Sequence, residues 1–496
     1  MRTYEPKIEV RLVKAIKRAE IIPDVPVVNR YGRLKAIDLT PYIGEEGGVH
    51  VSKGVREPCG AWSVTITDRE HPRLFETIYA LVEPMDMIEI RVAHDPFAYE
   101  SNPPILMRGF VSQVSRNEIM AGGKPIRTVT ISGQDFGKIL QILQIFYLNN
   151  SVVGDNILSQ FAFFHKYASD SAAKIKSGKD FVNEILDGVI NPYLARITAT
   201  AKGESIGAKV INKMTPDVTV EGNVSPYSIS QMNNVSVHQM LSYLLDVGAF
   251  NELYTEDTED GISLVVRPAP FLDVLGNPIQ GVKPKTIKIT SEDVVAINVS
   301  RTDAGVANYF WVSNSPWAMY GNETAQALAM QGKPESYIKF DYLNSQAAFY
   351  GIRKMEVSTM MGPPDYSASD STTVQAMPKQ TKTLGEWIDQ RRTILANINK
   401  DNVIFESGSL RVRGNEKIKA GMLLIVGRGN SGKARDKQGQ LQTNTSSRYY
   451  VTRVDHEFVP FQGFYTTVTV ERGTSFIDRA QNEESVYRLE IDGLGV

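Results

Sequence analysis

A phosphate-binding loop is the most specific chemical motif in the sequence. Residues 427–433 read Gly-Arg-Gly-Asn-Ser-Gly-Lys, which fits the spacing G-x-x-x-x-G-K, and they follow an apolar run at 422–426. The next residue is Ala434, so the hydroxyl that holds Mg²⁺ in such loops is missing. Residues 435–447 show no helical periodicity, so no helix N-terminus follows to bind phosphate. The segment is therefore predicted to be a flexible basic hairpin loop and not the nucleotide site of an ATPase.

An acidic run at residues 256–261, Glu-Asp-Thr-Glu-Asp-Gly, resembles the opening of a calcium-binding loop. Such a loop needs a bidentate Glu at its twelfth position, where this sequence has Arg267. The run separates two segments with strand patterning, and its Asp-Gly end is a strong hairpin marker. We therefore expect a solvated hairpin tip here.

The histidines and the single cysteine form no recognisable catalytic or metal-binding set. His456 stands beside Asp455, but neighbouring residues of a strand point to opposite faces. Cys59 lies in a Pro-Cys-Gly turn without an activating base in view. Carboxylates are plentiful, and none marks a glycosidase-like pair. We expect no catalytic, cofactor-binding or metal-binding residues, no cofactor, and an assembly component rather than an enzyme. The remaining histidines are His50, His71, His94, His165 and His238.

Composition limits the class of protein. The 496 residues carry 54 Lys and Arg against 56 Asp and Glu, and this balance argues against a dedicated nucleic-acid binder. The apolar fraction of 42% is enough for packed cores and excludes a disordered chain. One cysteine excludes a disulfide scaffold. No apolar run is long enough for a membrane span, and the first residues lack the apolar core of a signal peptide. The sequence indicates a soluble protein that folds in a reducing compartment.

Strand patterns dominate residues 1–137. Large apolar and small polar residues alternate at 62–67, 88–92, 110–114 and 128–132, and Gly and Pro pairs separate these runs. Apolar residues between 74 and 82 fall at helical spacing. We predict a first antiparallel barrel or sandwich with one short helix.

Helical spacing takes over in residues 138–225, which we predict to be a helical insertion and connector. Residues 226–285 are predicted to form a small unit of one helix and one hairpin. Ser236 and Gln239 fit a capping box, and an amphipathic stripe follows. Runs at 251–255 and 262–266 flank the Asp-Gly turn of the hairpin.

Strand patterns return in residues 286–475, which we predict to form a second β domain. Its expected strands lie at 294–299, 309–312, 410–412, 422–426, 449–454 and 464–470. An insertion at about 314–400 is expected to begin with long loops through 382 and to end in a helix capped at Thr383, with Glu386 completing a capping box. Residues 476–496 are predicted to be a C-terminal extension that reaches a neighbouring subunit or partner.

Short segments along the chain resemble, in order, phage tail baseplate hub proteins of the late control protein D-like and T4 hub-like family. The first domain of that family is similar to Gly60-Ala61-Trp62-Ser63-Val64-Thr65-Ile66-Thr67-Asp68 and to Ile131-Ser132-Gly133-Gln134-Asp135, together with residues 37–40, 49–51, 87–90 and 108–111. Later matches are the capped helix at Ser236, the Asp260-Gly261 hairpin with Arg267-Pro268, and residues 408–414, 417–423, 450–458 and 463–470. Residues 140–194 and 314–382 are not covered.

The resemblance implies two tail-tube-like antiparallel β-barrel domains in a β-dominated α+β chain. It implies a homotrimer whose six barrels form a pseudo-sixfold ring that adapts the hexameric tail tube to a trimeric spike and lines the DNA channel. The implied partners are the tail tube or an adjacent ring protein, the central spike, the tape measure protein and surrounding baseplate proteins. DNA would pass without specific binding, and the protein would reside in the virion tail after assembly in the host cytoplasm.

Three other functions stay open from the sequence. The chain could be the hub of a related injection machine, such as a tailocin or a type VI-like spike complex. It could be a tail-associated cell-wall hydrolase, which would need a clustered acid, histidine or cysteine site. It could also be a carbohydrate-binding adhesin, which need not form a ring.

Overall fold

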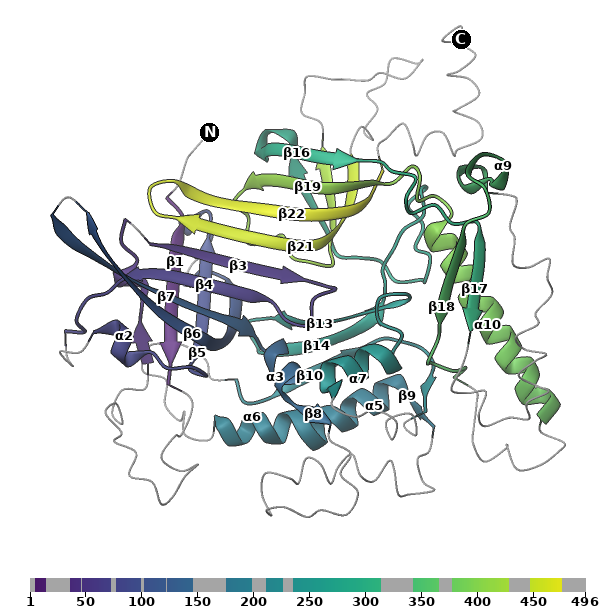
Figure 1. The fold of residues 1–496 in the computed structure, drawn as a ribbon, viewed down its shortest axis with the longest axis horizontal. Coiled ribbons are helices and arrows are strands. Elements are labelled where there is room, and N and C mark those ends of the chain that lie inside the picture. The colour runs from purple at the N-terminus through teal and green to yellow at the C-terminus, as the bar shows by residue number, and fades with distance from the viewer. Residues whose placement is uncertain are drawn as a thin grey trace, which may run out of the picture.

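The computed structural model describes residues 5–14, 36–45, 47–72, 77–99, 102–121, 123–145, 175–198, 211–225, 235–313, 342–364, 377–427 and 447–474. A single 13-stranded sheet runs through the molecule, and its main path is β16-β19-β22-β21-β3-β4-β7-β6-β5-β1-β2 (Figure 1). Strands predominate over helices, which confirms the β-dominated α+β class. The described strands form no closed barrel, so the two barrels remain a prediction.

The first part of the sheet contains the early strands predicted from alternation. Residues that alternate along these strands build one core, which includes Val51, Val64, Ile66 and Ile131. Every neighbouring pair in this part is antiparallel. The short predicted helix is a single turn, α2 (Ile78–Leu81), capped by Thr77. The strands are β1 (Lys7–Val13), β2 (Ala36–Asp38), β3 (Gly48–Gly54), β4 (Ala61–Thr67), β5 (Met87–Ala93), β6 (Ile105–Ala121) and β7 (Lys124–Asp135); η1 (Thr40–Tyr42) and η2 (Pro96–Ala98) are 3₁₀ turns.

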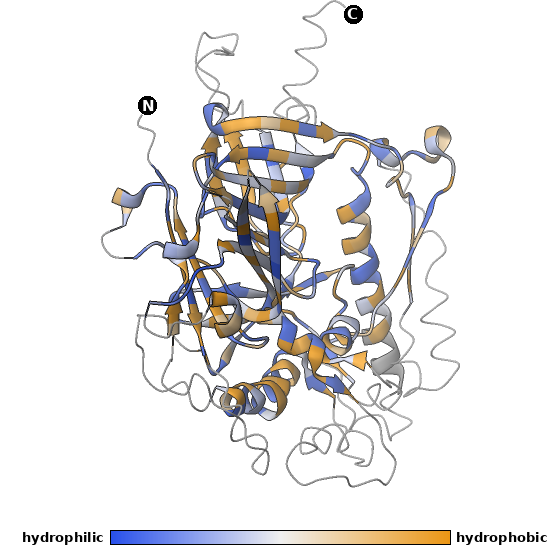
Figure 2. Ribbon diagram, turned by 60° about the vertical axis from the view of Figure 1, so that its left-hand side comes forward, coloured by the Kyte–Doolittle hydropathy of each residue, from blue (hydrophilic) through white to orange (hydrophobic). Residues whose placement is uncertain are grey.

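The second part of the sheet comes from the last third of the chain. Its core includes Leu410, Leu424, Val454 and Val468. One pair in it, β15 with β20, is parallel, which corrects the expectation of purely antiparallel pairing. The strands are β15 (Thr286–Thr290), β16 (Val294–Ser300), β19 (Glu406–Arg413), β20 (Leu423–Gly427), β21 (Ser447–Val459) and β22 (Gly463–Thr474), with the 3₁₀ turn η5 (Ser291–Asp293) before β16. Hydrophobic and hydrophilic residues alternate along many strands (Figure 2).

The two parts of the sheet repeat one pairing pattern, and we call them the first and second units. In chain order, β3, β4, β6 and β7 correspond to β16, β19, β21 and β22, and in space they lie as β3-β4-β7-β6 and β16-β19-β22-β21. The pairings align residues 48–52, Gly-Val-His-Val-Ser, with 296–300, Ala-Ile-Asn-Val-Ser. They also align 110–114, Phe-Val-Ser-Gln-Val, with 450–454, Tyr-Val-Thr-Arg-Val.

Backbone irregularities recur at the same places in both units. The β6–β7 ladder shifts register between Val111 and Gln113, and the β21–β22 ladder shifts between Val451 and Arg453. Met85 and Gly421 have positive φ of 71° and 82°. Their amides donate to the carbonyls of Val111 and Val451, each at 2.8 Å. A shared bulge and a shared left-handed residue show that the two units are structural repeats.

Helices cover the lower side of the sheet in Figure 1 and complete a core that joins them to it. They are α3 (Gly137–Ile142), α5 (Gly178–Ile185), the π-helical turn η3 (Leu186–Ile190), α6 (Asn191–Ile197) and α7 (Val237–Leu244). Ser177 caps α5, and Ser236 with Gln239 forms the predicted capping box of α7. Two short ladders pair β8 (Gln144–Ile145) with β12 (Val235–Ser236) and β9 (Lys176–Ser177) with β11 (Asn223–Val224).

The predicted hairpin is confirmed as β13 (Asn251–Asp257) and β14 (Ile262–Pro268), with seven antiparallel residue pairs. A third strand, β10 (Met214–Val218), lies parallel to β14. The domain boundaries at 137, 225, 285 and 475 stay predictions.

The insertion in the second unit differs from its prediction. The strand expected at 309–312 exists as β17 (Tyr309–Ser313), but it pairs in parallel with β18 (Lys354–Ser358) in a separate two-stranded sheet packed on α10 (Met377–Asn399). The expected N-cap at Thr383 is wrong, because α10 already begins at Met377. Part of the expected loop region is ordered as β18, η8 (Leu343–Ser345) and α9 (Ala347–Tyr350); residues 314–341 and 365–376 lie outside the described part.

Gly385 lies inside α10, and a Cβ added there would meet nothing within 4 Å. Glycine costs a helix interior about 1 kcal/mol relative to alanine. We expect Gly385→Ala to raise the free energy of unfolding in urea by about that amount. Gly351→Ala is the contrasting control, because φ there is 70° and alanine should destabilise the fold.

Candidate assembly interface

The two units meet at a strand seam between β3 and β21, which we call the internal seam. Six antiparallel residue pairs join the strands, from Arg453 opposite Gly54 to Phe458 opposite Val49. Phe464 of β22 packs into the core of the first unit, so the seam is closed by side chains as well as by backbone. The N-terminal part of β21 pairs instead with β20, just as the N-terminal part of β6 pairs with β5. Strand β21 therefore takes part both in the sheet of the second unit and in the internal seam.

The β13–β14 hairpin docks against the first unit through Asp257, whereas Glu259 and Asp260 at its tip are exposed, so the predicted solvated tip holds for these two residues and not for Asp257. Asp257 is buried and accepts from Lys53 Nζ at 2.7 Å. Lys53 also pairs with buried Asp135 at 3.0 Å. Arg108 donates to the carbonyl of Thr258 at 2.7 Å. Because buried Asp257 and Asp135 share the ammonium group of Lys53, these contacts act as a structural lock between the hairpin and the first unit.

Neighbouring carboxylates keep the two cations of this lock, Lys53 and Arg91, charged. Burial alone would lower the pKa of Lys53, but the carboxylates of Asp257 and Asp135 outweigh it and raise the pKa. Arg91 pairs with Glu259 of the tip at 3.0 Å. Burial would likewise lower the pKa of Arg91, and its hydrogen bonds and ion pairs raise it instead.

The base of the same hairpin is fixed to the second unit. Arg267 Nη2 donates to the carbonyl of Gly421 at 2.8 Å and pairs with Glu252 at 3.1 Å. Tyr450 of β21 donates to Glu252. Burial raises the pKa of Glu252, although Arg267 and Tyr450 oppose the change. Lys419 Nζ donates to the carbonyl of Asp257 at 3.1 Å. The hairpin thus ties both units together beside the internal seam, and we call it the clamp.

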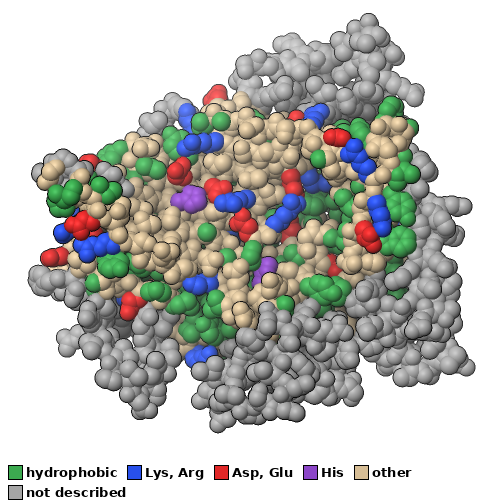
Figure 3. Space-filling view, in the orientation of Figure 1, with side chains coloured by type: hydrophobic (Ala, Val, Ile, Leu, Met, Phe, Trp, Pro, Cys, Tyr) green, Lys and Arg blue, Asp and Glu red, His purple; other side chains and the backbone are tan. Residues whose placement is uncertain are grey.

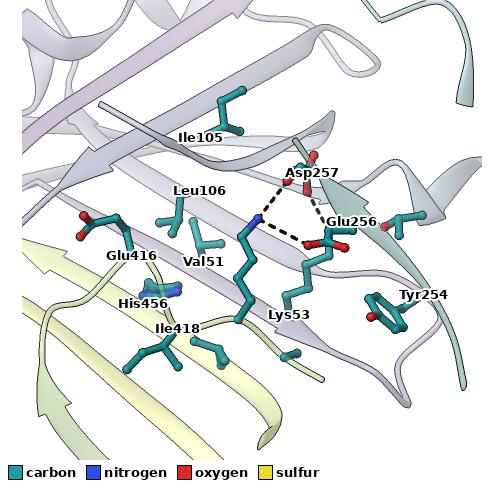
Figure 4. A pocket seen from close by; sticks show the side chains of 14 residues that line it. Val51, Lys53, Ile105, Leu106, Tyr254, Glu256, Asp257, Glu416, Ile418 and His456 are labelled. Atoms are coloured by element: carbon teal, nitrogen blue, oxygen red, sulfur yellow. Dashed lines mark hydrogen bonds and ion pairs between the residues drawn. The ribbon is translucent and has the colours of Figure 1, made fainter. Parts of the chain in front are cut away.

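A small cavity lies where the two units and the clamp meet (Figure 4). Val51, Leu106, Ile418 and His456 lie together on one side of it, and the charged groups of the clamp lie on the other. Its volume is about 50 Å³, which is room for water and not for a sizeable substrate.

His456 is buried on the core face of the sheet, and Asp455 lies on the opposite face, as strand alternation predicts. The His456 Nδ1 atom lies 3.0 Å from Thr466 Oγ1, and the ring stacks on Phe464. Asp455 is held by Arg453 at 3.0 Å. Burial lowers the pKa of His456 to about 4. The two residues therefore do not form an acid–base pair.

The buried imidazole makes stability depend on pH. Its pKa is depressed in the folded protein relative to 6.5, so the unfolded chain binds the proton first as pH falls. We expect the free energy of unfolding to lose about 3 kcal/mol from this group as pH falls from about 6.5 to about 4. The free energy of unfolding of His456→Gln, measured in urea across this pH range, should not show this decrease. Identical slopes in both proteins would contradict the assignment.

The other candidate groups stay apart in the structure. Cys59 Sγ lies 3.3 Å from Gln141 Oε1, and burial raises the pKa of the thiol to about 12. His94 pairs with Glu416 at 2.8 Å. Among the described residues no group of three or more His, Cys, Asp and Glu is placed to hold a metal ion. The phosphate-loop candidate beyond Gly427 and His165 lie outside the described residues. None of the described helices has the length and apolar character needed to cross a membrane.

One face of the joined sheet is polar. Along the paired strands, hydroxyl and amide side chains alternate with core residues such as Val64 and Val454. Two ion pairs lie on the second unit's part of this face, Arg453 with Asp455 and Arg411 with Glu457. On the face drawn in Figure 3, basic and acidic side chains are interspersed and neither sign forms one large patch. The uncharged row includes Ser63, Thr65, Ser115, Asn117, Thr130, Ser132, Asn298, Ser409, Thr467 and Thr469.

The two ends of the eight-strand path from β16 to β6 are open among the described strands. β16 pairs only with β19, and β6 beyond Phe110 pairs only with β7. Large apolar side chains are exposed at both ends, with exposed fractions of 54% for Ile119, 71% for Met120, 54% for Val295 and 51% for Ile297. Open edges with apolar side chains are typical of surfaces that another chain covers.

Comparisons with known proteins give structural matches only. No protein-family model matches the chain, and no curated protein matches its sequence. A tail protein from Neisseria meningitidis MC58 shares 9% identity with a TM-score of 0.44, over 94% of this chain and 97% of that one. The 43 kDa tail protein of prophage MuSo2 from Shewanella oneidensis shares 10% identity with a TM-score of 0.41, over 94% and 96% of the two chains.

A third match is a type VI secretion system component from E. coli, described as structurally similar to the T4 bacteriophage tail proteins gp27 and gp5. It shares 8% identity with a TM-score of 0.35, over 88% of this chain and 77% of that one. The neighbours are phage tail and type VI secretion proteins. This is the class of protein that the sequence resemblance indicates.

Proposed function

We propose that this chain is the structural baseplate hub of a phage tail, and that three copies form a pseudo-sixfold ring between a hexameric tail tube and a trimeric spike. The observation that carries the proposal is the structural repeat, with two equivalent units joined edge to edge by the internal seam. Three copies of a two-unit chain present six similar positions. A threefold object can then match a sixfold partner on one side and a threefold partner on the other.

The strand directions support closure of such a ring. The eight strands from β16 to β6 alternate in direction at every step. Because their number is even, the two end strands run in opposite directions. Identical copies placed side by side therefore continue the antiparallel pattern, and a head-to-tail contact of this kind closes into a ring when the rotation fits.

The polar face supports a channel lining. Basic surfaces hold DNA because they release counterions from its phosphates. On the second unit's part of this face, Arg411 and Arg453 are already paired with acids, and the first unit's part carries Ser, Thr and Asn. DNA would slide along such a wall without specific binding. The further partners in the proposal are the tape measure protein and the surrounding baseplate proteins, and the location is the virion tail after assembly in the host cytoplasm.

The native mass of the purified chain, followed by class averages of the particles, tests the proposal. We expect a species near three times 55.1 kDa that is ring-shaped with a central hole. A stable monomer that digests peptidoglycan would overturn the structural hub in favour of a hydrolase. A monomer that binds host glycans would favour an adhesin.

The same geometry serves the hub of a tailocin or a type VI-like spike complex, because those machines also join a tube to a spike. Capsid and DNA-packaging genes beside the coding sequence would favour the phage. Their absence from the neighbourhood would favour the other machines.

A further inference from the structure

Resting on the proposed ring, we propose that the contact between copies pairs β6 of one copy with β16 of the next, in the register of the internal seam. In each chain the second half of β21 pairs with β3. The repeat makes β6 equivalent to β21 and β16 equivalent to β3. The internal seam is therefore a template for the contact between copies, which we call the external seam.

The register follows from the aligned ladders. Val114 is equivalent to Val454, because they pair with the equivalent residues Ile131 and Val468. Ile297 is equivalent to Val49, because they pair with Leu410 and Val64. The pairs Asp455–Ser52 and Glu457–His50 of the internal seam then translate into Ser115–Ser300 and Asn117–Asn298 of the external seam.

The predicted register brings compatible side chains together. Further along, Ile119 comes opposite Ala296 and Met120 opposite Val295, so the exposed apolar side chains of Met120 and Val295 cover each other, while Ile297 comes opposite Glu118. The two named polar pairs contain no charge, so no like charges face each other there. A slip by one residue would join the polar face of one copy to the core face of the next, because side chains alternate between the two faces along a strand.

Paired cysteines test the register in the full chain. Cys59→Ser removes the only native cysteine and serves as the parent. Asn117→Cys with Asn298→Cys is the test variant, because directly opposed residues of antiparallel strands lie about 4.5–5.5 Å apart at Cα, within disulfide range. Asn117→Cys with Val299→Cys is the slipped control. His50→Cys with Glu457→Cys is the positive control, which should close within one chain at the internal seam.

After mild oxidation and denaturing electrophoresis, we expect the test variant to run as a covalent trimer. The slipped control should stay monomeric, and each single cysteine should give no trimer. A parent that is trimeric by native mass but whose test variant stays monomeric, or crosslinks only in the slipped control, overturns the register and leaves the ring intact. A parent that stays monomeric at all accessible concentrations, with no crosslink in any pair between chains, overturns the ring and the external seam together.

Discussion

Replacement of Lys53 by methionine is expected to lower the free energy of unfolding by about 3–5 kcal/mol. The ammonium group holds two buried carboxylates, Asp257 at 2.7 Å and Asp135 at 3.0 Å. Methionine fills similar space but leaves both carboxylates beside each other without their shared cation. Removal of one partner from a buried ion pair is costly because the remaining charge stays desolvated. Urea unfolding at neutral pH measures the loss.

A matched control separates this effect from charge removal in general. Lys285 pairs with Glu256 of the same hairpin at 3.3 Å, but its side chain is 68% exposed. Exposed pairs contribute less than about 1 kcal/mol, so Lys285→Met should leave stability nearly unchanged. Equal effects of the two substitutions would show that the clamp does not depend on the buried ion pairs.

The clamp explains how one chain can hold two units in a fixed relation. The internal seam supplies backbone pairing, and the hairpin adds ionic contacts to the first unit and to the second. The open edges of β6 and β16 carry no equivalent clamp among the described residues. A permanent internal seam and a simpler external seam would let each copy fold alone and then assemble.

Local signals in the sequence predicted local structure well. The capping box of Ser236 and the Asp-Gly hairpin are both confirmed, because each depends on residues within a few positions of one another. Alternation likewise located the strands around Trp62, Val129 and Val468. The cap expected at Thr383 failed because a capping box can also occur inside a longer helix.

Contacts between distant segments were not accessible to the same reasoning. Docking of Asp257 depends on Lys53, 204 residues away, and nothing in the acidic run signals a partner. Strand β17 was expected in the second barrel but pairs in parallel with β18 in a separate sheet. Its own sequence gives no signal of this partner, which lies more than 40 residues further along the chain. The repeat did leave a trace, since Gly-Val-His-Val-Ser and Ala-Ile-Asn-Val-Ser align, but five residues are too few to identify without the ladders.

Gly133→Ala is expected to lower the free energy of unfolding by about 3 kcal/mol or more, which is the upper range for overpacking a core. A Cβ at this position would lie 2.1 Å from the carbonyl oxygen of Phe110 and 2.4 Å from the Trp62 ring. In the second unit the glycine of the equivalent pair lies on the other strand. Gly408 of β19 stands opposite Val470 of β22, whereas in the first unit Trp62 of β4 stands opposite Gly133 of β7. A Cβ at Gly408 would lie 2.0 Å from the carbonyl oxygen of Asn298, so in each unit the glycine of this pair lies where a neighbouring backbone carbonyl approaches closely. Thermal and urea unfolding measure the loss.

Gly427→Ala is the matched control, because Gly427 also lies in a strand of the large sheet and its nearest contact would be an ordinary 3.6 Å from Ile289 O. It should change stability far less than Gly133→Ala. Adding Trp62→Ala to Gly133→Ala should not restore stability, since the Phe110 carbonyl belongs to the neighbouring strand and cannot move without breaking the ladder. Full rescue by Trp62→Ala would mean that only the ring, and not the close backbone approach, requires glycine.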